Sequence, residues 1–251
     1  MSNVRPHRMP LDETLTLVGR SASIDLPADT LLVALDETGH EGFAPTHRVF
    51  GLGGCACLVK HYGQLIDDPW CAMKAELFGG RDVPLHAAKL HNPTDEQLEA
   101  LGIFFTKFQF FRFAVMAAET LENTTQFQLT KIVCRSVLDR VAEMAAFAHP
   151  KGVALVFEHS ERIGQDVMFE LSGYRMGDGD VEFEPKPYTL PKSVNSSMLE
   201  VADFVMQAAG AQVRNRLQRK FGIRRDFDLI FHRVDRHLSH YVELLSVKSA
   251  A

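Results

Sequence analysis

Four acidic residues lie in parts of the sequence that are otherwise apolar. Asp36 and Glu37 end the run TLLVALDE, Glu158 ends the run GVALVFE, and Asp203 lies in the stretch LEVADFVMQAAGA. A carboxylate is rarely buried unless it is paired, protonated or bound to a metal. Carboxylates at the ends of adjacent strands, together with one from a facing helix, would converge on one point. A divalent cation would relieve their mutual repulsion there.

Such a set of oxygen ligands suits Mg²⁺ or Mn²⁺, and two ions about 4 Å apart support in-line attack on a phosphodiester. We therefore expect metal ligands at Asp36, Glu37, Glu158 and Asp203. Glu37 could instead position the attacking water. His86 is a candidate for a proton shuttle at the edge of the site.

Each acid also has a structural explanation. Asp36 and Glu37 precede Thr-Gly, a pattern that is common in turns. Glu158 could pair with Arg162 four residues later, and Asp203 could pair with a Lys or Arg across the core. The catalytic interpretation requires the three segments to be adjacent in space.

A basic run follows the acid of the last long helix. It comprises Arg214, Arg216, Arg219, Lys220, Arg224 and Arg225. These cations could complement the helix dipole as a solvated helix end. They could also follow the phosphates of a nucleic acid, with Arg214, Arg219 and Lys220 as the expected contacts.

The order of the elements predicts an α/β protein with a mixed central sheet. A β-hairpin over 31–59 comes first, and strands then alternate with helices that pack on the sheet. Residues 1–30 are expected to be an irregular lead-in to a single domain over 31–251. The other expected elements are helices at 69–78, 93–108, 124–149, 162–174 and 196–222, and strands at 108–119, 152–160, 181–190 and 227–237 with a short helical tail.

Bulk composition is that of a globular protein, with 46% hydrophobic and 24% charged residues. The net charge of −5 argues against a wholly basic nucleic-acid-binding surface. The four cysteines are expected to be reduced core residues. Neither a signal-peptide core nor a membrane-length apolar stretch occurs, so a soluble, cytoplasmic protein is expected.

Several short motifs occur in a fixed order along the chain. They are LVALDETGHEGF followed by VFGLGGCACLV, Trp70 with Lys74, Leu85-His86-Ala87, Glu158 with Arg162 and Asp166, and Leu199 to Asp203. Together they resemble the uncharacterised prokaryotic family catalogued as domain of unknown function 3800. That family has a D-E-[ST]-G turn, W-x-x-x-K and L-H-[AG] stretches, and an L-Q-x-A-D helix. The resemblance covers residues 31–215, most of the chain.

The resemblance implies a ribonuclease H-like fold. Asp36 would be the central metal ligand with Glu37 beside it, Glu158 the acid of a second strand and Asp203 the acid of a late helix. Ser193 would lie at the rim of the site, in contact with substrate.

This chain departs from the family pattern near the last long helix. Glu200 replaces the usual Gln and adds a negative charge close to the site. The family's Asp-Ser-Lys approach reads here as Lys192-Ser193-Val194, so an acid is lost and the cation is displaced. These changes could alter metal geometry or the grip on substrate.

The leading hypothesis is a Mg²⁺- or Mn²⁺-dependent nuclease that acts on RNA or DNA. The alternative is a non-catalytic interaction or regulatory module on the same fold, with phage defence as one context. A zinc-dependent hydrolase that uses His and acids is a third option. The oligomeric state is left open, with a homodimer as one candidate.

Overall fold

The computed structural model describes most of the 251-residue chain. The described residues are 7–8, 14–18, 23–39, 49–90, 92–118, 126–158, 165–172, 175, 184–191 and 196–244.

A mixed sheet with the strand order β8-β7-β4-β5-β6-β9 forms the centre of the fold. Strand β5 is antiparallel to both of its neighbours, and the other adjacent pairs are parallel. The expected α/β class, mixed sheet and leading hairpin are confirmed, and β8 lies at an edge of the sheet. The strands are β4 (Thr30–Gly39), β5 (Val49–Leu58), β6 (Phe111–Ala118), β7 (Gly152–Glu158), β8 (Lys186–Leu190) and β9 (Ser239–Leu244).

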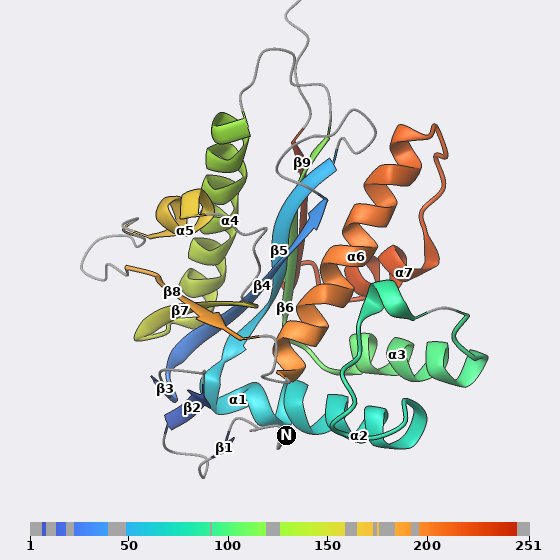
Figure 1. Cartoon of the computed structure of the whole chain (residues 1–251), viewed down its shortest axis with the longest axis horizontal. Helices are drawn as coiled ribbons and strands as arrows, with labels where there is room; N and C mark the ends of the chain where they lie inside the picture. Colours follow the sequence, from blue (N-terminus) through green and yellow to red (C-terminus); the bar gives the residue numbers. More distant parts are fainter. Residues whose placement is uncertain are drawn as a thin grey trace, which may run out of the picture.

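Two long helices cover opposite faces of this sheet (Figure 1). In β4, Leu32 and Ala34 pack in one core with residues of α6 (Ser197–Leu217). Leu31, Val33 and Leu35, which alternate with them, pack in a second core with α4 (Gln126–Ala148). Successive side chains of a strand point to opposite faces, so the sheet separates two cores.

The remaining helical segments lie around these layers. Helix α3 begins at the expected capping box, in which Thr94 Oγ1 accepts from the Gln97 backbone amide at 3.2 Å. No helix in the described part of the chain is both long and apolar enough to cross a bilayer. These segments are α1 (Val59–Tyr62), α2 (Asp68–Leu77), α3 (Asp95–Lys107), α5 (Gln165–Leu171), α7 (Arg225–Phe227), the π-helical turns η1 (Gly63–Asp67) and η3 (Asp228–His232), and the 3-10 turn η2 (Ala87–Lys89).

The N-terminal residues are more regular than expected. Strands β1 (His7–Arg8), β2 (Thr14–Val18) and β3 (Ser23–Pro27) form a separate antiparallel sheet. The side chains of Leu15, Leu17 and Leu26, which belong to this sheet, are buried. The prediction of an irregular lead-in over 1–30 is therefore wrong, because alternating apolar residues in β2 give that strand a buried face.

The expected strand over 227–237 is also wrong. Residues 225–232 are helical, and Phe227, Ile230 and Phe231 are buried. Their spacing of three and four residues places them on one helix face. The strand follows as β9, in the position where a helical tail was expected.

The four cysteines are all buried and none of them forms a disulfide, as expected for reduced core residues. Cys55 and Cys57 both belong to the core beneath α6. Burial raises the pKa of the Cys57 thiol to about 12, so this thiol is not a reactive nucleophile at neutral pH.

Candidate functional site

Two of the predicted acids lie side by side at the ends of adjacent parallel strands. The register of β4 and β7 pairs Leu35 with Phe157, so Asp36 and Glu158 each come one residue later. Ala34 and Val156, two residues earlier, both belong to the core beneath α6. Side chains alternate along a strand, and Asp36 and Glu158 therefore share the face that α6 covers.

Helix α6 brings the third acid to the same place. A Cβ at Gly54 would lie 2.8 Å from Ala202 Cβ and against the carbonyl oxygen of Ala34. The backbone of the sheet thus has close contact with α6 one residue before Asp203. Asp203 remains 26% exposed, so its carboxylate is accessible to a ligand.

The charges of these acids act on one another. Burial raises the pKa of Asp36 well above its usual value, and the charges of Glu37, Asp203 and Glu158 raise it further. Burial also raises the pKa of Asp203, with Glu158 and Glu200 adding to the effect. Such coupling requires proximity. The strand register and these mutual effects therefore place Asp36, Glu158 and Asp203 near one another. Their role as metal ligands stays a prediction.

Glu37 is placed differently from its neighbour. It follows Asp36 in β4 and shares the parity of Val33 and Leu35, which pack against α4. Its side chain therefore leaves the sheet on the face opposite Asp36. The turn explanation for the pair is wrong, because β4 continues to Gly39 and Thr38 pairs with Gly51 of β5. A shared ligand role for Asp36 and Glu37 has no support from this alternation.

The segment that contains His86 holds the helix acid. The Ala87 backbone amide donates to Asp203 Oδ2 at 2.8 Å, and His86 Nδ1 lies 3.8 Å from the same oxygen. This hydrogen bond lowers the pKa of Asp203, as does the charge of His86, against the larger effect of burial. The structure thus places His86 next to Asp203. A cross-core pairing of Asp203 with Lys or Arg is not seen among the described residues.

Glu200, one helical turn before Asp203, is neutralised within the core. Both of its carboxylate oxygens accept from Lys74 Nζ at 2.8 Å, and Oε2 also accepts from Trp70 Nε1 at 2.5 Å. The Leu85 backbone amide donates to Oε1 at 3.0 Å. Glu200 therefore does not add an unpaired charge to the site. It ties α2 and the extended segment before η2 to α6.

Sequence reasoning missed this network of contacts around Glu200. The sequence contained only one sign of this network, the order and spacing of the motifs that carry the family resemblance. Those motifs include Trp70, Lys74, Leu85-His86-Ala87 and Glu200. Leu85 bonds to Glu200 and Ala87 bonds to Asp203, so one short segment fixes two carboxylates three residues apart on α6.

The acids do not form a closed metal cage. Within the part of the chain that the structure describes, no three His, Cys, Asp or Glu side chains form a group that could hold an ion as they stand. The donors are nevertheless carboxylate oxygens, and burial and neighbouring negative charges raise the pKa values of Asp36 and Asp203, which is a cost that a hard divalent cation compensates. An ion would have to draw Asp36, Glu158 and Asp203 inward.

The basic run divides into paired and unpaired cations. Arg216 pairs with Glu243, and Arg224 Nε pairs with Asp226 Oδ1 at 3.0 Å. Among the described residues, no ion-pair partner occurs for Arg214, Arg219, Lys220 and Arg225.

Within the basic run, Arg214 is the cation that lies closest to Asp203 along α6. It follows Asp203 by eleven residues, which is about three turns and about 16 Å along the same side of α6. A Cβ at Gly210 would meet both Arg214 Nη1 at 3.1 Å and the side chain of Thr38, two residues beyond Asp36. Arg219 and Lys220 are exposed past the end of the helix.

Other predicted residues lie outside the described part of the chain. These are Ser193, the proposed rim residue, and Arg162, the alternative partner of Glu158. Their roles therefore stay predictions. No protein-family model, curated protein or solved structure matches this chain, and its function is argued from the geometry above.

Proposed function

We propose that this protein is a divalent-metal-dependent nuclease that hydrolyses phosphodiesters in RNA or DNA. The observation that carries the proposal is the meeting of Asp36, Glu158 and Asp203, from two strands and a helix, where burial and mutual repulsion raise the pKa values of Asp36 and Asp203. Acids whose ionised forms are destabilised by burial and by neighbouring negative charges are typical of functional sites.

The arrangement also supports a ribonuclease H-like assignment as part of the proposal. The β4–β5 hairpin leads a mixed sheet, two acids lie on adjacent strands, and the third lies on the late helix α6. These are the features that the resemblance to the family of unknown function implied.

Each residue has a definite role in the proposed reaction. Asp36, Glu158 and Asp203 would hold Mg²⁺ or Mn²⁺, which would neutralise charge on the phosphodiester and acidify the attacking water. His86, which is 40% exposed beside Asp203, would exchange a proton with the leaving oxygen. Arg214, further along α6, would contact another phosphate of the bound strand.

Activity measurements test this proposal. We expect Mn²⁺-dependent cleavage of a labelled oligonucleotide by the wild-type chain, and a loss of at least about 100-fold in Asp36→Asn, because the central ligand is removed. Asp139→Asn, an exposed acid of α4 on the other side of the sheet, is the matched control and should retain activity. Equal activity in Asp36→Asn and wild type would contradict the proposal.

A second candidate is a non-catalytic interaction or regulatory module. It is favoured by the lack of a ready metal-binding group among the described residues. A ligand that binds only the native state must raise the Tm. If Mg²⁺ and Mn²⁺ leave the Tm of the wild-type chain unchanged, this second candidate replaces the nuclease.

A further inference from the structure

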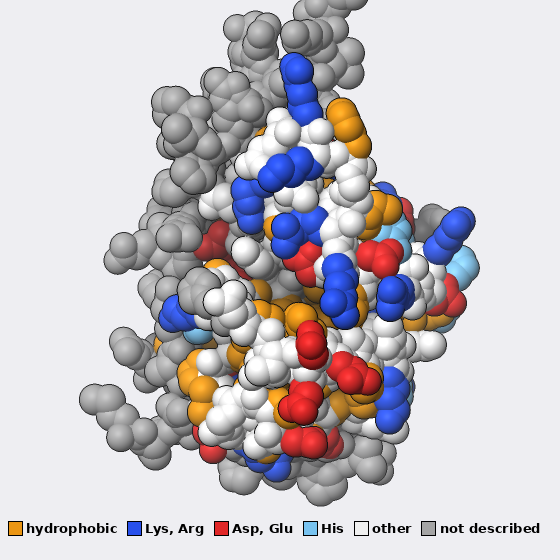
Figure 2. Space-filling view, turned by 90° about the vertical axis from the view of Figure 1, so that its right-hand side faces the viewer, with side chains coloured by type: hydrophobic (Ala, Val, Ile, Leu, Met, Phe, Trp, Pro, Cys, Tyr) orange, Lys and Arg blue, Asp and Glu red, His pale blue; other side chains and the backbone are white. Residues whose placement is uncertain are grey.

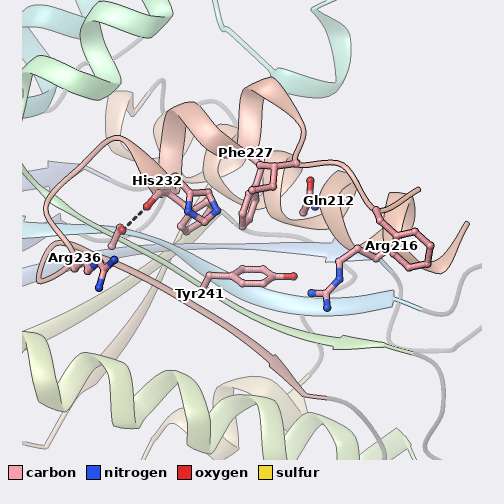
Figure 3. A pocket seen from close by; sticks show the side chains of 10 residues that line it. Gln212, Arg216, Phe227, His232, Arg236 and Tyr241 are labelled. Carbon is pink, nitrogen blue, oxygen red and sulfur yellow. Dashed lines mark hydrogen bonds between the residues drawn. The ribbon is translucent and has the colours of Figure 1, made fainter. Parts of the chain in front are cut away.

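A pocket lies on the side of α6 that faces away from Asp203 (Figure 3). Its volume is about 600 Å³, within the usual range for small-molecule sites. It forms where the C-terminal half of α6, the turn after it, α7, η3 and β9 meet. Its chemically distinctive lining residues are Phe221, Phe227, Phe231, Tyr241, Arg216 and Arg236.

Aromatic rings make up the inner wall of this pocket. Phe227 and Phe231 are stacked with centroids 4.8 Å apart, and Tyr241 meets Phe227 edge-on at 4.9 Å. The His232 ring contacts Phe227 at 5.2 Å. Flat, rigid rings in mutual contact give a surface on which another planar ring can stack.

Two arginines lie at opposite ends of Tyr241 in Figure 3. Arg216 is held by Glu243, which also accepts from the Tyr241 hydroxyl at 3.4 Å. Arg236 is exposed, and among the described residues it has no ion-pair partner. Arg236 is therefore available to an anionic ligand, while Arg216 serves to fix the tyrosine.

The outer wall is held in place by Gln212. Its side chain accepts from the Arg224 backbone amide at 2.9 Å and donates to the Gly222 carbonyl at 3.3 Å. Ile223, which lies between these two contacts, is 60% exposed, and Phe221, which precedes them, is 87% exposed. Exposed apolar side chains at the mouth of a pocket indicate a binding surface.

The basic run joins this pocket to the acid site. Asp203 faces the β4–β7 side of α6, and Gln212, nine residues later, lies half a turn round the helix and about 14 Å further along it. A nucleic-acid strand that ran from the acid site to the pocket would cross the C-terminal end of α6. Figure 2 shows Lys and Arg side chains gathered over that end, whereas acidic side chains gather lower on this face, towards α2 and α3.

We propose that the pocket binds a base of single-stranded nucleic acid, with its ring against Phe221 and the inner aromatic wall, and that Arg236 contacts a phosphate of the same strand. This inference rests on the proposed function, because it assumes a nucleic-acid substrate. A single strand is required, since only unpaired bases expose faces that can stack on side chains. The rise of about 14 Å along α6 alone corresponds to about four nucleotides at about 3.4 Å per stacked nucleotide, so the pocket would hold a base at least that far from the acid site.

Binding in the absence of metal tests the pocket separately from catalysis. The affinity of a fluorescent single-stranded 12-nucleotide RNA or DNA would be measured by anisotropy in EDTA. The base chain would be the Asp36→Asn variant. We expect Phe221→Ala to weaken binding about five- to 140-fold, the usual range for loss of one stacked base. Phe221 is exposed, so its loss leaves the core intact.

Two matched control variants test whether the loss of affinity is specific to the pocket. Phe169→Ala removes a ring that is 73% exposed on α5, and Arg135→Gln removes an exposed cation of α4 on the opposite layer. Both should bind within about twofold of the parent, whereas Arg236→Gln should bind more weakly than Arg135→Gln.

Three results would overturn the inference. They are an affinity that Phe221→Ala does not change, equal loss in Phe169→Ala, and a preference for duplex or for a free mononucleotide over the single strand. Failure of the nuclease proposal gives a different result. If the protein binds single strands through Phe221 but does not cleave them, the pocket inference holds and the nuclease proposal is wrong.

Discussion

At the scale of single residues, the crowding of carboxylates around Asp36 is the defining feature. Three negative neighbours and burial raise its pKa. The ionised carboxylate therefore opposes folding, and the chain loses stability as pH rises from the ordinary pKa of Asp, about 3.9, towards the raised value of the folded state.

Replacing Asp36 by Asn should accordingly stabilise the metal-free protein at pH 7. We expect a Tm higher by at least about 2 °C, the shift that about 1 kcal/mol produces in a chain of this size. Below about pH 3.9, where Asp is protonated in both states, the gain should vanish. Melting curves in EDTA at both pH values measure this, with Asp139→Asn as control. A lower Tm in Asp36→Asn at pH 7 would contradict the described electrostatics.

The buried pair of Lys74 and Glu200 gives a second prediction at this scale. The two side chains are 1% and 6% exposed, so Lys74→Met leaves a buried carboxylate without its cation. We expect a cost of about 3–5 kcal/mol in urea unfolding. Adding Glu200→Gln should recover part of it, since the uncompensated charge is removed. If the double variant loses the sum of both single effects, the pair is not coupled.

Sequence reasoning located these residues unevenly. The three acids that meet were recognisable because each interrupts an apolar run. The position of Glu37 was missed, although alternation along a strand already separates neighbours by face. The partner of Glu200 lies 126 residues away, and only the tertiary fold brings it there.

At the scale of elements, the close packing of α6 on the β4–β5 hairpin positions the site. Gly54 has φ +152°, and a Cβ there would collide with the Ala34 carbonyl and press on Ala202. Small residues at this crossing let Asp203 approach the ends of β4 and β7. The helix and the hairpin therefore depend on each other for the geometry of the acids.

Gly54→Ala tests this dependence. Backbone strain and overpacking should together destabilise the protein by about 2–4 kcal/mol, measured by urea unfolding. Gly222→Ala is the matched control, because nothing lies within 4 Å of a Cβ at that position. Equal stability of the two variants would show that α6 is packed less closely than described.

Element prediction succeeded where periodicity was unambiguous. The hairpin, α4 and α6 have apolar patterns long enough to identify strand or helix. Residues 227–237 mix apolar and basic side chains, so their pattern fits the helical repeat and the strand repeat only in part. The packing of Phe227 and Phe231 against Tyr241 stabilises the helical form. The small N-terminal sheet was missed because its strands are at most five residues long.

At the scale of the whole molecule, charge is distributed by region. The net charge is −5, yet the end of α6 is basic. Binding of nucleic acid should therefore depend on a few cations. We expect Arg219→Gln and Lys220→Gln each to lower the slope of log K against log salt by about 0.7 on a single strand. Arg135→Gln should leave the slope unchanged, and a slope that no variant alters would exclude this end of the helix as the contact.

The central claim is that Asp36, Glu158 and Asp203 together hold a divalent ion. Anomalous scattering from crystals soaked in Mn²⁺ tests it most directly. We predict a manganese peak bonded to carboxylate oxygens of these three residues at about 2.0–2.2 Å, the distance typical of small hard cations. A soaked crystal in which the three carboxylates stay apart with no manganese between them would contradict it.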